Sequence, residues 1–292
     1  MMHLQMIGLA GAIAVGSRLL ARIKPADTSW RIRWQTTLTT FVVPPLFLMA
    51  TAISIVAMGM SDTPRWEGEL SFTVAAGFVV AAATLWLQII WLAVKTQRQM
   101  RQYPQKIIRS TAERGNGTPG RVVETSAVFS AQIGLWASEL VVSRGLLEYL
   151  DAEHLEAVLA HESGHAHYRD TFWFFWLGGL RRLTCWLPQS EALWQELLLL
   201  REVRADEWAA RRVDSLVLAE SLMSVITAPL LNTETICASF SCAAPRSRLA
   251  QRVDALLMGA PALAQTSRWF SAVQWGAIAL SLSPLTTIPF HH

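Results

Sequence analysis

The sequence predicts a mainly α-helical membrane protein with about four transmembrane helices and one cytoplasmic α+β domain. Of its 292 residues, 52% are hydrophobic and only 16% are charged, whereas an ordinary soluble domain has about 25% charged residues. Long stretches lack any Asp, Glu, Lys or Arg, and the loops between them alternate in charge. These three observations favour a multi-pass membrane protein over a soluble one.

Four segments are expected to cross the membrane. Three are uncharged and approach or exceed the roughly 20 residues that a bilayer core requires. These are Thr37–Met60, Ser71–Val94 and Trp269–Phe290. The fourth, about residues 4–20, includes Arg18, whose long side chain can extend to the interface. A signal peptide is the alternative, but no basic region precedes this segment. Residues 1–94 and 269–290 are therefore predicted to be the transmembrane regions.

Loop charges predict the orientation. Residues 18–36 hold five Lys or Arg against one Asp, and residues 95–121 hold seven against one Glu, while residues 61–70 hold three acidic residues against one Arg. Because cytoplasmic loops are enriched in Lys and Arg, both termini are expected outside and residues 95–268 in the cytoplasm. The basic linker at 95–121 suits anionic lipid headgroups. The expected partners therefore include the bilayer, and direct binding to nucleic acid is not expected.

Residues 122–257 are expected to form the α+β domain. β-branched and aromatic residues with partial alternation predict two or three short strands, in Arg121–Phe129 and Ala131–Ser143. Asp151 has the chemistry of a helix N-cap and predicts a helix that runs through Tyr168.

Two features of this domain leave alternatives open. Thr171–Ser190 contains an apolar run of about ten residues, too short to span a bilayer, so it is either an interfacial or re-entrant element or an ordinary buried helix. Cys185, Cys237 and Cys242 fit no C-x-x-C zinc pattern. We expect unpaired buried thiols, with a Cys237/Cys242 metal or redox site as the alternative.

His161, Glu162 and His165 form a His-Glu-x-x-His motif inside the first predicted helix. Four residues make about one helical turn, so the two imidazoles share a face and can bind one ion. Glu162 lies about 100° round the helix, where it can act as a general base on water. Two solvated histidines on a helix are the alternative interpretation. The motif predicts a zincin-like metallopeptidase domain that binds one Zn²⁺.

The third zinc ligand is expected on a second helix, Glu191–Val213. Glu202 and Asp206 lie one turn apart on its apolar stripe, where a carboxylate is costly unless something pairs with it. We predict Glu202 as the ligand, and Asp206 as the acceptor of the remaining ring N–H of His161. Arg204, Tyr168 and His167 are the three side chains considered as transition-state donors. The strand near Gln132–Trp136 is expected to hold an extended substrate by strand addition.

Three stretches resemble gluzincin integral membrane metallopeptidases. They are SRGLLEYLDAEHLEAVLAHESGHAHYRD (143–170), REVRADEWAA (201–210) and PRSRLAQRVDALL (245–257). They look like the zinc domain of the BlaR/MecR antirepressor peptidases and the HtpX-type proteases. The resemblance implies that His161, His165 and Glu202 bind zinc, that Glu162 is the base, and that the membrane is the inner membrane of a bacterium. The gap of 37 residues between the motifs has no room for the two membrane helices of HtpX-type enzymes, which favours the BlaR/MecR branch. The chain shows no penicillin-binding sensor domain, so only the protease half is implied.

We therefore expect a membrane-embedded zinc endopeptidase that cleaves a cytoplasmic or membrane-proximal protein, with a transcriptional repressor as one candidate substrate. The alternatives are an HtpX-like quality-control protease and a non-catalytic zinc-containing membrane receptor. The oligomeric state is not predicted.

Overall fold

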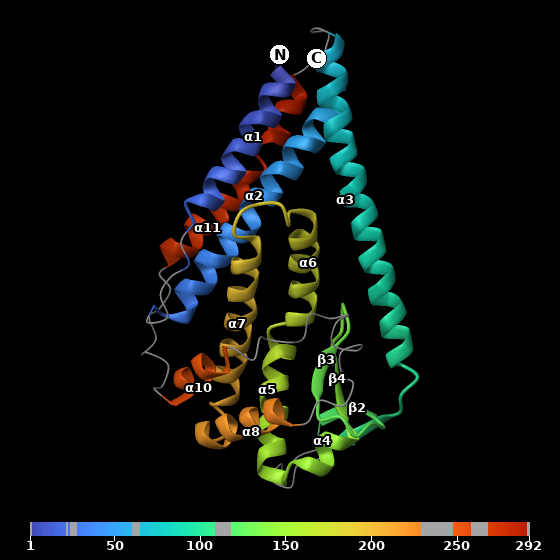
Figure 1. Ribbon diagram of the computed structural model, residues 1–292, viewed down its shortest axis with the longest axis vertical. Coiled ribbons are helices and arrows are strands. Elements are labelled where there is room, and N and C mark those ends of the chain that lie inside the picture. The colour runs from blue at the N-terminus through green and yellow to red at the C-terminus, as the bar shows by residue number, and fades with distance from the viewer. Residues whose placement is uncertain are drawn as a thin grey trace. The chain divides into compact units, whose positions relative to one another are not determined.

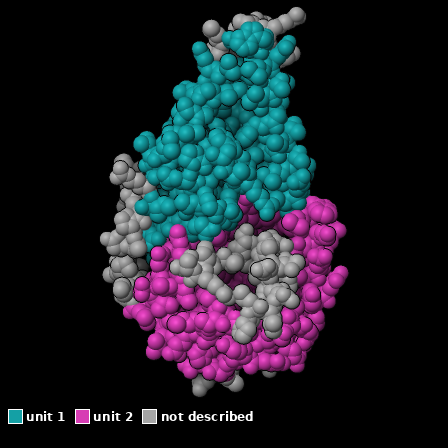
Figure 2. Space-filling view, in the orientation of Figure 1, with its two compact units in different colours: residues 1–89, 179–197, 264–292 teal, residues 90–178, 198–263 magenta. Residues whose placement is uncertain are grey.

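The computed structural model is mostly helical, with one small sheet (Figure 1). It describes residues 2–21, 23, 28–59, 65–108, 118–228, 248–257 and 268–290. The chain forms two compact units, coloured separately in Figure 2. Unit 1 comprises residues Met1–Ile89, Gly179–Leu197 and Ala264–His292, and unit 2 comprises Ile90–Gly178 and Leu198–Leu263.

Unit 1 is built around one long helix, α2. Its elements include α1 (Met2–Leu19), α2 (Trp30–Met58), most of α3 (Arg65–Met100), α11 (Arg268–Ser281) and the 3-10 helix η2 (Ser283–Phe290). Helices α1, α11 and η2 all pack against α2 (Figure 1). Ala14 of α1 and both Phe41 and Ala50 of α2 are buried, and small residues such as alanine let two helices approach closely.

Among the described residues, two helices are long and apolar enough to cross a membrane, judged by length and composition: α2, and Trp66–Met100 within α3. The helix α2 covers the predicted span 37–60 only up to Met58 and begins at Trp30, whereas Trp66–Met100 contains the whole predicted span 71–94. The predicted span at 4–20 is helical in α1. The segment 269–290 is not one continuous α-helix, because α11 ends at Ser281 and is followed by the 3-10 helix η2. Pro284 has no backbone N–H to continue the hydrogen bonds of an α-helix. Four spans therefore stay a prediction.

A buried ion pair joins α2 to the first half of α7 (Ser190–Ala209) within unit 1. Arg33 Nε lies 2.9 Å and Arg33 Nη2 2.5 Å from Glu196 Oε1. Both side chains are buried. Each charge compensates the other, which a buried charge requires.

Unit 2 contains a four-stranded sheet in the order β1-β2-β4-β3. The strands are β1 (Gln105–Ile108), β2 (Thr118–Val123), β3 (Ser130–Ile133) and β4 (Glu139–Ser143). β2 and β4 run parallel, and β1 and β3 pair antiparallel at the two edges. The sequence predicted the region of β2–β4. β1 lies inside the segment 95–121 that was expected to be a linker, which also contains the end of α3.

The helices of unit 2 pack on both sides of α5 (Ala152–His167). The others are α4 (Arg144–Tyr149), the start of α6 (Asp170–Leu183), the end of α7, α8 (Ser215–Thr227) and α10 (Leu249–Leu257). On one side, Val158 and Leu155 of α5 join a core with Val142 of β4. On the other, Ala157 and Ala160 pack with residues of α7, α8 and α10. These two cores fix the rotation of α5.

Several helix predictions are confirmed with small shifts at the ends. Asp151 is the N-cap of α5, and its carboxylate accepts from the backbone N–H groups of Glu153 and His154. The segment Thr171–Ser190 begins inside the α-helix α6. The prediction that Cys185 is buried is wrong, because its side chain is exposed at the turn after α6. Cys237 and Cys242 lie outside the described residues.

Candidate metal centre

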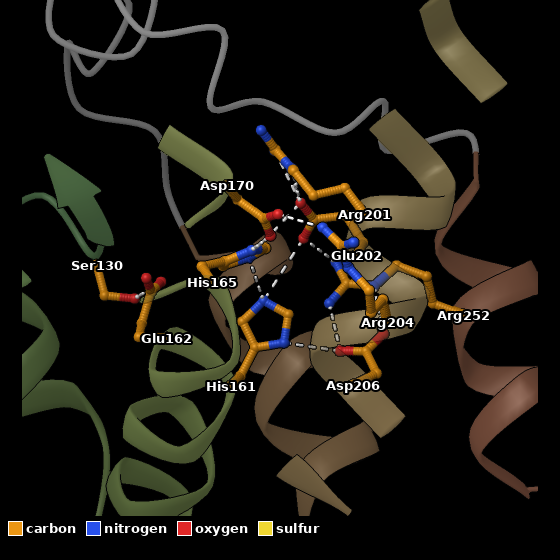
Figure 3. Close-up of polar contacts among 10 residues, drawn as sticks. All are labelled: Ser130, His161, Glu162, His165, Asp170, Arg201, Glu202, Arg204, Asp206 and Arg252. Carbon is orange, nitrogen blue, oxygen red and sulfur yellow. Dashed lines mark hydrogen bonds and ion pairs between the residues drawn. The ribbon is translucent and has the colours of Figure 1, made fainter. Parts of the chain in front are cut away.

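Helix α5 presents two imidazoles to one point (Figure 3). The Nε2 atoms of His161 and His165 lie 3.1 Å apart, and their rings are perpendicular. His161 is buried, and the side chain of His165 is only 12% exposed. The two imidazoles therefore share one face of the helix, as their spacing of one helical turn predicts, and both Nε2 atoms face the same position.

Glu202 of α7 completes the group. Its Oε2 lies 3.5 Å from His161 Nε2, and its Oε1 lies 3.7 Å from His165 Nε2. Each residue offers one ligand atom, and the three atoms lie within 4.8 Å of one another. A tetrahedral zinc ion with bonds of about 2.0–2.1 Å places its ligand atoms about 3.3 Å apart. The observed separations and the chemistry of two imidazoles and a carboxylate fit such an ion.

A glycine allows the two helices to meet at this point. A Cβ atom on Gly164 would lie 3.0 Å from Ala205 Cα, 3.2 Å from Ala205 O and 3.2 Å from Trp208 Cδ1. The backbone of α7 thus passes directly against Gly164. This close approach brings Glu202 within reach of the histidines.

Each histidine has a carboxylate at its other ring nitrogen. Asp206 Oδ1 lies 2.8 Å from His161 Nδ1, the pairing that the sequence predicted. Asp170 Oδ2 lies 2.7 Å from His165 Nδ1, and Asp170 also accepts a hydrogen bond from Arg204 Nη2. A carboxylate at Nδ1 fixes the ring orientation and leaves Nε2 for a metal. This role of Asp170 was not predicted from the sequence.

Two buried arginines hold the carboxylates of α7, and neither was predicted. Arg252 of α10 makes two hydrogen bonds of 2.8 Å to Asp206, and its Nη1 lies 3.3 Å from Glu202 Oε2. Arg201 Nη2 lies 2.8 Å from Glu202 Oε1. The negative charges of Glu202 and Asp206 are therefore compensated by the guanidinium groups of Arg201 and Arg252 (Figure 3).

The charges in this network set the protonation states. Burial opposes the imidazolium form of His161, but the hydrogen bond and charge of Asp206 outweigh it and raise the pKa of His161 to about 9. Burial would raise the pKa of Glu202, yet the charge of Arg201 contributes to holding it well below its ordinary value. Burial works against Asp206 as well, and Arg252 lowers its pKa. Both carboxylates are thus ionised at neutral pH, and His161 must release a proton when a metal binds.

Glu162 has a different neighbour. Its Oε1 accepts a hydrogen bond of 2.7 Å from Ser130 Oγ of β3, and its Oε2 is buried with no hydrogen-bond partner among the described residues. In Figure 3 its carboxylate is directed toward Ser130 and lies apart from the three candidate ligands. One carboxylate oxygen is therefore held by Ser130, and the other has no hydrogen-bond donor among the described residues.

The three predicted transition-state donors make other contacts. His167 stacks on Trp208, with ring centroids 3.7 Å apart. The Arg204 guanidinium lies over the ring of Tyr168, 4.2 Å from its centroid, and Arg204 bonds to Asp170. These contacts are made with side chains other than the three candidate ligands. Arg204 is linked to the centre through Asp170, which lies at the Nδ1 atom of His165.

Comparison with known proteins gives one match. Residues 95–230 match the model of peptidase family M48. No curated protein and no solved structure matches the chain. The matched segment contains α5 and the part of α7 that carries Glu202, whereas α10 lies beyond it. The match supports a metallopeptidase of the zinc-dependent M48 family, and His161, His165 and Glu202 are the side chains that lie together as its possible metal site.

Proposed function

We propose that the protein is a membrane-embedded zinc endopeptidase. The observation that carries this proposal is the convergence of His161, His165 and Glu202 from two helices, with their ligand atoms within 4.8 Å. The M48 match covers all three residues, and α2 and α3 are apolar enough to span a bilayer. One zinc ion per chain would be held by two Nε2 atoms and the Glu202 carboxylate.

The side chains divide the chemistry among them. Bound zinc supplies a Lewis acid that polarises a peptide carbonyl and makes water more acidic. Glu162 Oε2 accepts a proton from the attacking water and then donates it to the leaving amine. Asp206 and Asp170 hold the two histidines in the tautomer that presents Nε2. A purely structural zinc site would have no use for Glu162, which argues against the non-catalytic receptor.

The edge strand β3 is the proposed substrate-binding element. It pairs with β4 on one side only, in a sheet whose described order ends at β3. An extended peptide can add to such an edge by backbone hydrogen bonds. Trp136, in the turn after β3, is 66% exposed. Its ring packs on that of Phe172, with the ring centroids 5.4 Å apart. These rings offer an apolar surface to a substrate side chain.

We place the enzyme in a bacterial inner membrane, with four spans, both termini outside and the zinc domain in the cytoplasm. The support is the loop charge pattern together with the two apolar helices. The substrate is proposed to be a cytoplasmic or membrane-proximal protein, with a transcriptional repressor first among the candidates by the BlaR/MecR-like motifs. Quality-control cleavage of membrane proteins is the second candidate, because the same motifs also resemble HtpX-type proteases.

Glu162→Gln tests the enzymatic part of the proposal. The purified full chain is loaded with zinc, its metal content is measured, and cleavage of casein or of the chain itself is followed. We expect about one zinc per chain in both proteins and a loss of activity of about 10²-fold or more in the variant. Glu153→Gln, which changes an exposed residue in the first turn of the same helix, is the matched control. Equal activity of wild type and Glu162→Gln would rule out the proposed reaction.

A further inference from the structure

We propose that Ser130 is a positioning residue for the general base. Its hydroxyl fixes Oε1 of Glu162, so that Oε2 is the oxygen that accepts and returns the proton. This inference rests on the proposed function, because it assigns a task within the same reaction. It adds a residue of β3 that neither the motif nor the metal-binding group contains.

The contact has the geometry of a strong hydrogen bond. The distance from Ser130 Oγ to Glu162 Oε1 is 2.7 Å, the usual value for a hydroxyl that donates to an oxygen. Glu162 is buried, with 7% of its surface exposed. Water therefore competes little with the hydroxyl, and a hydrogen bond to a carboxylate in a buried setting restricts the side chain strongly.

The position of Ser130 is itself fixed by the sheet. Ser130 pairs with Val142 of β4, a fully buried residue. The preceding residue, Phe129, is held by Ser143: the Phe129 N–H donates to Ser143 Oγ at 3.1 Å, and Phe129 O accepts from the Ser143 N–H and hydroxyl, each at 3.1 Å. Ser143 Oγ also accepts from Leu146 N as the N-cap of α4. A hydroxyl on so rigid a strand can set the direction of Glu162.

The two oxygens of Glu162 are thereby made unequal. Oε1 is occupied by Ser130, while Oε2 is buried and has no hydrogen-bond partner within the described ranges. A buried carboxylate oxygen without a donor is uncommon and calls for a functional explanation. A general base needs one oxygen free to take a proton and a fixed torsion that aims it. The arrangement of Ser130 and Glu162 supplies both.

Steady-state kinetics of the zinc-loaded full chain tests the proposal. Ser130→Ala removes the donor, and Ser130→Thr keeps it. Ser138→Ala, in the turn between β3 and β4, is the matched control. We expect kcat of Ser130→Ala to fall about tenfold, a part of what a general base contributes, with KM changed by less than about twofold. Ser130→Thr should recover most of kcat, and zinc content should stay at about one.

Three kinetic results would overturn the inference. An unchanged kcat in Ser130→Ala would show that the hydroxyl has no part in the reaction. A loss of kcat that Ser130→Thr does not recover, or that Ser138→Ala shares, would show a structural role of the strand. A rise in kcat would show that the hydrogen bond holds the base in an unproductive direction.

A second measurement is independent of activity. The melting temperature of the metal-free protein is compared for Ser130→Ala, Glu162→Met and the double variant. If the hydrogen bond forms, the two single effects are not additive. Additive changes in melting temperature would show that Ser130 and Glu162 do not interact, which would overturn the inference. The proposed zinc peptidase activity would not be affected by that result. Non-additive melting combined with full activity of Glu162→Gln would instead overturn the proposed function and the assigned role of Ser130 together.

Discussion

Gly164 of α5 lies directly against the backbone of α7, where a Cβ atom would come within 3.0 Å of Ala205 Cα. Because His161 and His165 are on one helix and Glu202 is on the other, the separation of α5 and α7 sets the size of the metal-binding group. The close packing at Gly164 thus determines how near the three candidate ligands lie to one another.

Substitution of Gly164 tests this relationship. Val at this position should separate the helices, and overpacking of this kind costs about 1–3 kcal/mol, so the zinc dissociation constant should rise about tenfold or more. Ala should give a smaller change in the same direction. Gly77→Ala is the control, because a Cβ atom at this helical glycine would meet nothing within 4 Å. Competition with a chromophoric chelator measures the affinity, and equal affinities for Gly164→Val and wild type would contradict the expectation.

Glu202→Ala should lower the zinc content of the purified protein from about one per chain to well below one, because two imidazoles alone bind zinc weakly. The control is Glu207→Gln on the same helix, whose carboxylate pairs with Arg211. Elemental analysis of the full chain gives the result. A full zinc complement in Glu202→Ala would show that another group is the third ligand.

Asp206→Asn and Asp170→Asn should each weaken zinc binding about 10–100-fold, since each removes the charge that orients one histidine. Asp170 makes this prediction informative, because nothing in the motif assigns it a role. Asp254→Asn, at an exposed position of α10, should leave the affinity unchanged. If only Asp206→Asn has an effect, then His165 does not depend on Asp170 for its orientation.

Arg252→Met should destabilise the metal-free domain by about 3–5 kcal/mol, as expected when one partner of a buried ionic network is removed. The reason is that Asp206 loses two hydrogen bonds of 2.8 Å. Zinc should reduce the loss, because the bound metal also compensates Glu202. Melting temperatures with and without zinc check this, with Gln251→Ala on the exposed face of α10 as control. An equal loss of stability with and without zinc would show that the contribution of Arg252 does not depend on the metal centre.

The pKa of His161 predicts how the stability of the metal-free protein changes with pH. Its folded-state pKa is raised from 6.5 to about 9. The imidazolium therefore contributes stability that is fully present below pH 6.5 and is lost as the pH rises through about 9. The melting temperature should fall across this window, and Asp206→Asn should flatten the fall. A melting temperature that rises with pH between these values would contradict the assignment.

The sequence predicted the residues whose faces are set by helical spacing. Two histidines one turn apart must share a face, and Glu202 and Asp206 interrupt an apolar stripe where an ionised side chain needs a partner. For the same local reason Asp151 could be recognised as the N-cap of α5. These signals lie within one helix and depend on little else.

The residues that were missed depend on the tertiary fold. Ser130 and Arg252 reach the centre from β3 and α10, and no spacing within one element relates them to the motif. Asp170 is close in sequence, but its direction follows from the turn at Arg169, whose φ of 54° ends the helical pattern. β1 was missed because a strand of four residues at a sheet edge, largely exposed, has no apolar alternation to reveal it.

Without the metal, the ion-paired side chains around the candidate centre carry no excess of negative charge. Arg201, Arg204, Arg252 and, at neutral pH, the imidazolium of His161 are paired with the carboxylates of Asp170, Glu202 and Asp206 in one buried network. Depletion of zinc therefore leaves no excess of negative charge to drive the helices apart. Unlike small zinc modules that unfold when chelated, this domain should complete its folding first and acquire its ion afterwards, so that metal supply regulates the reaction while the amount of folded protein stays constant.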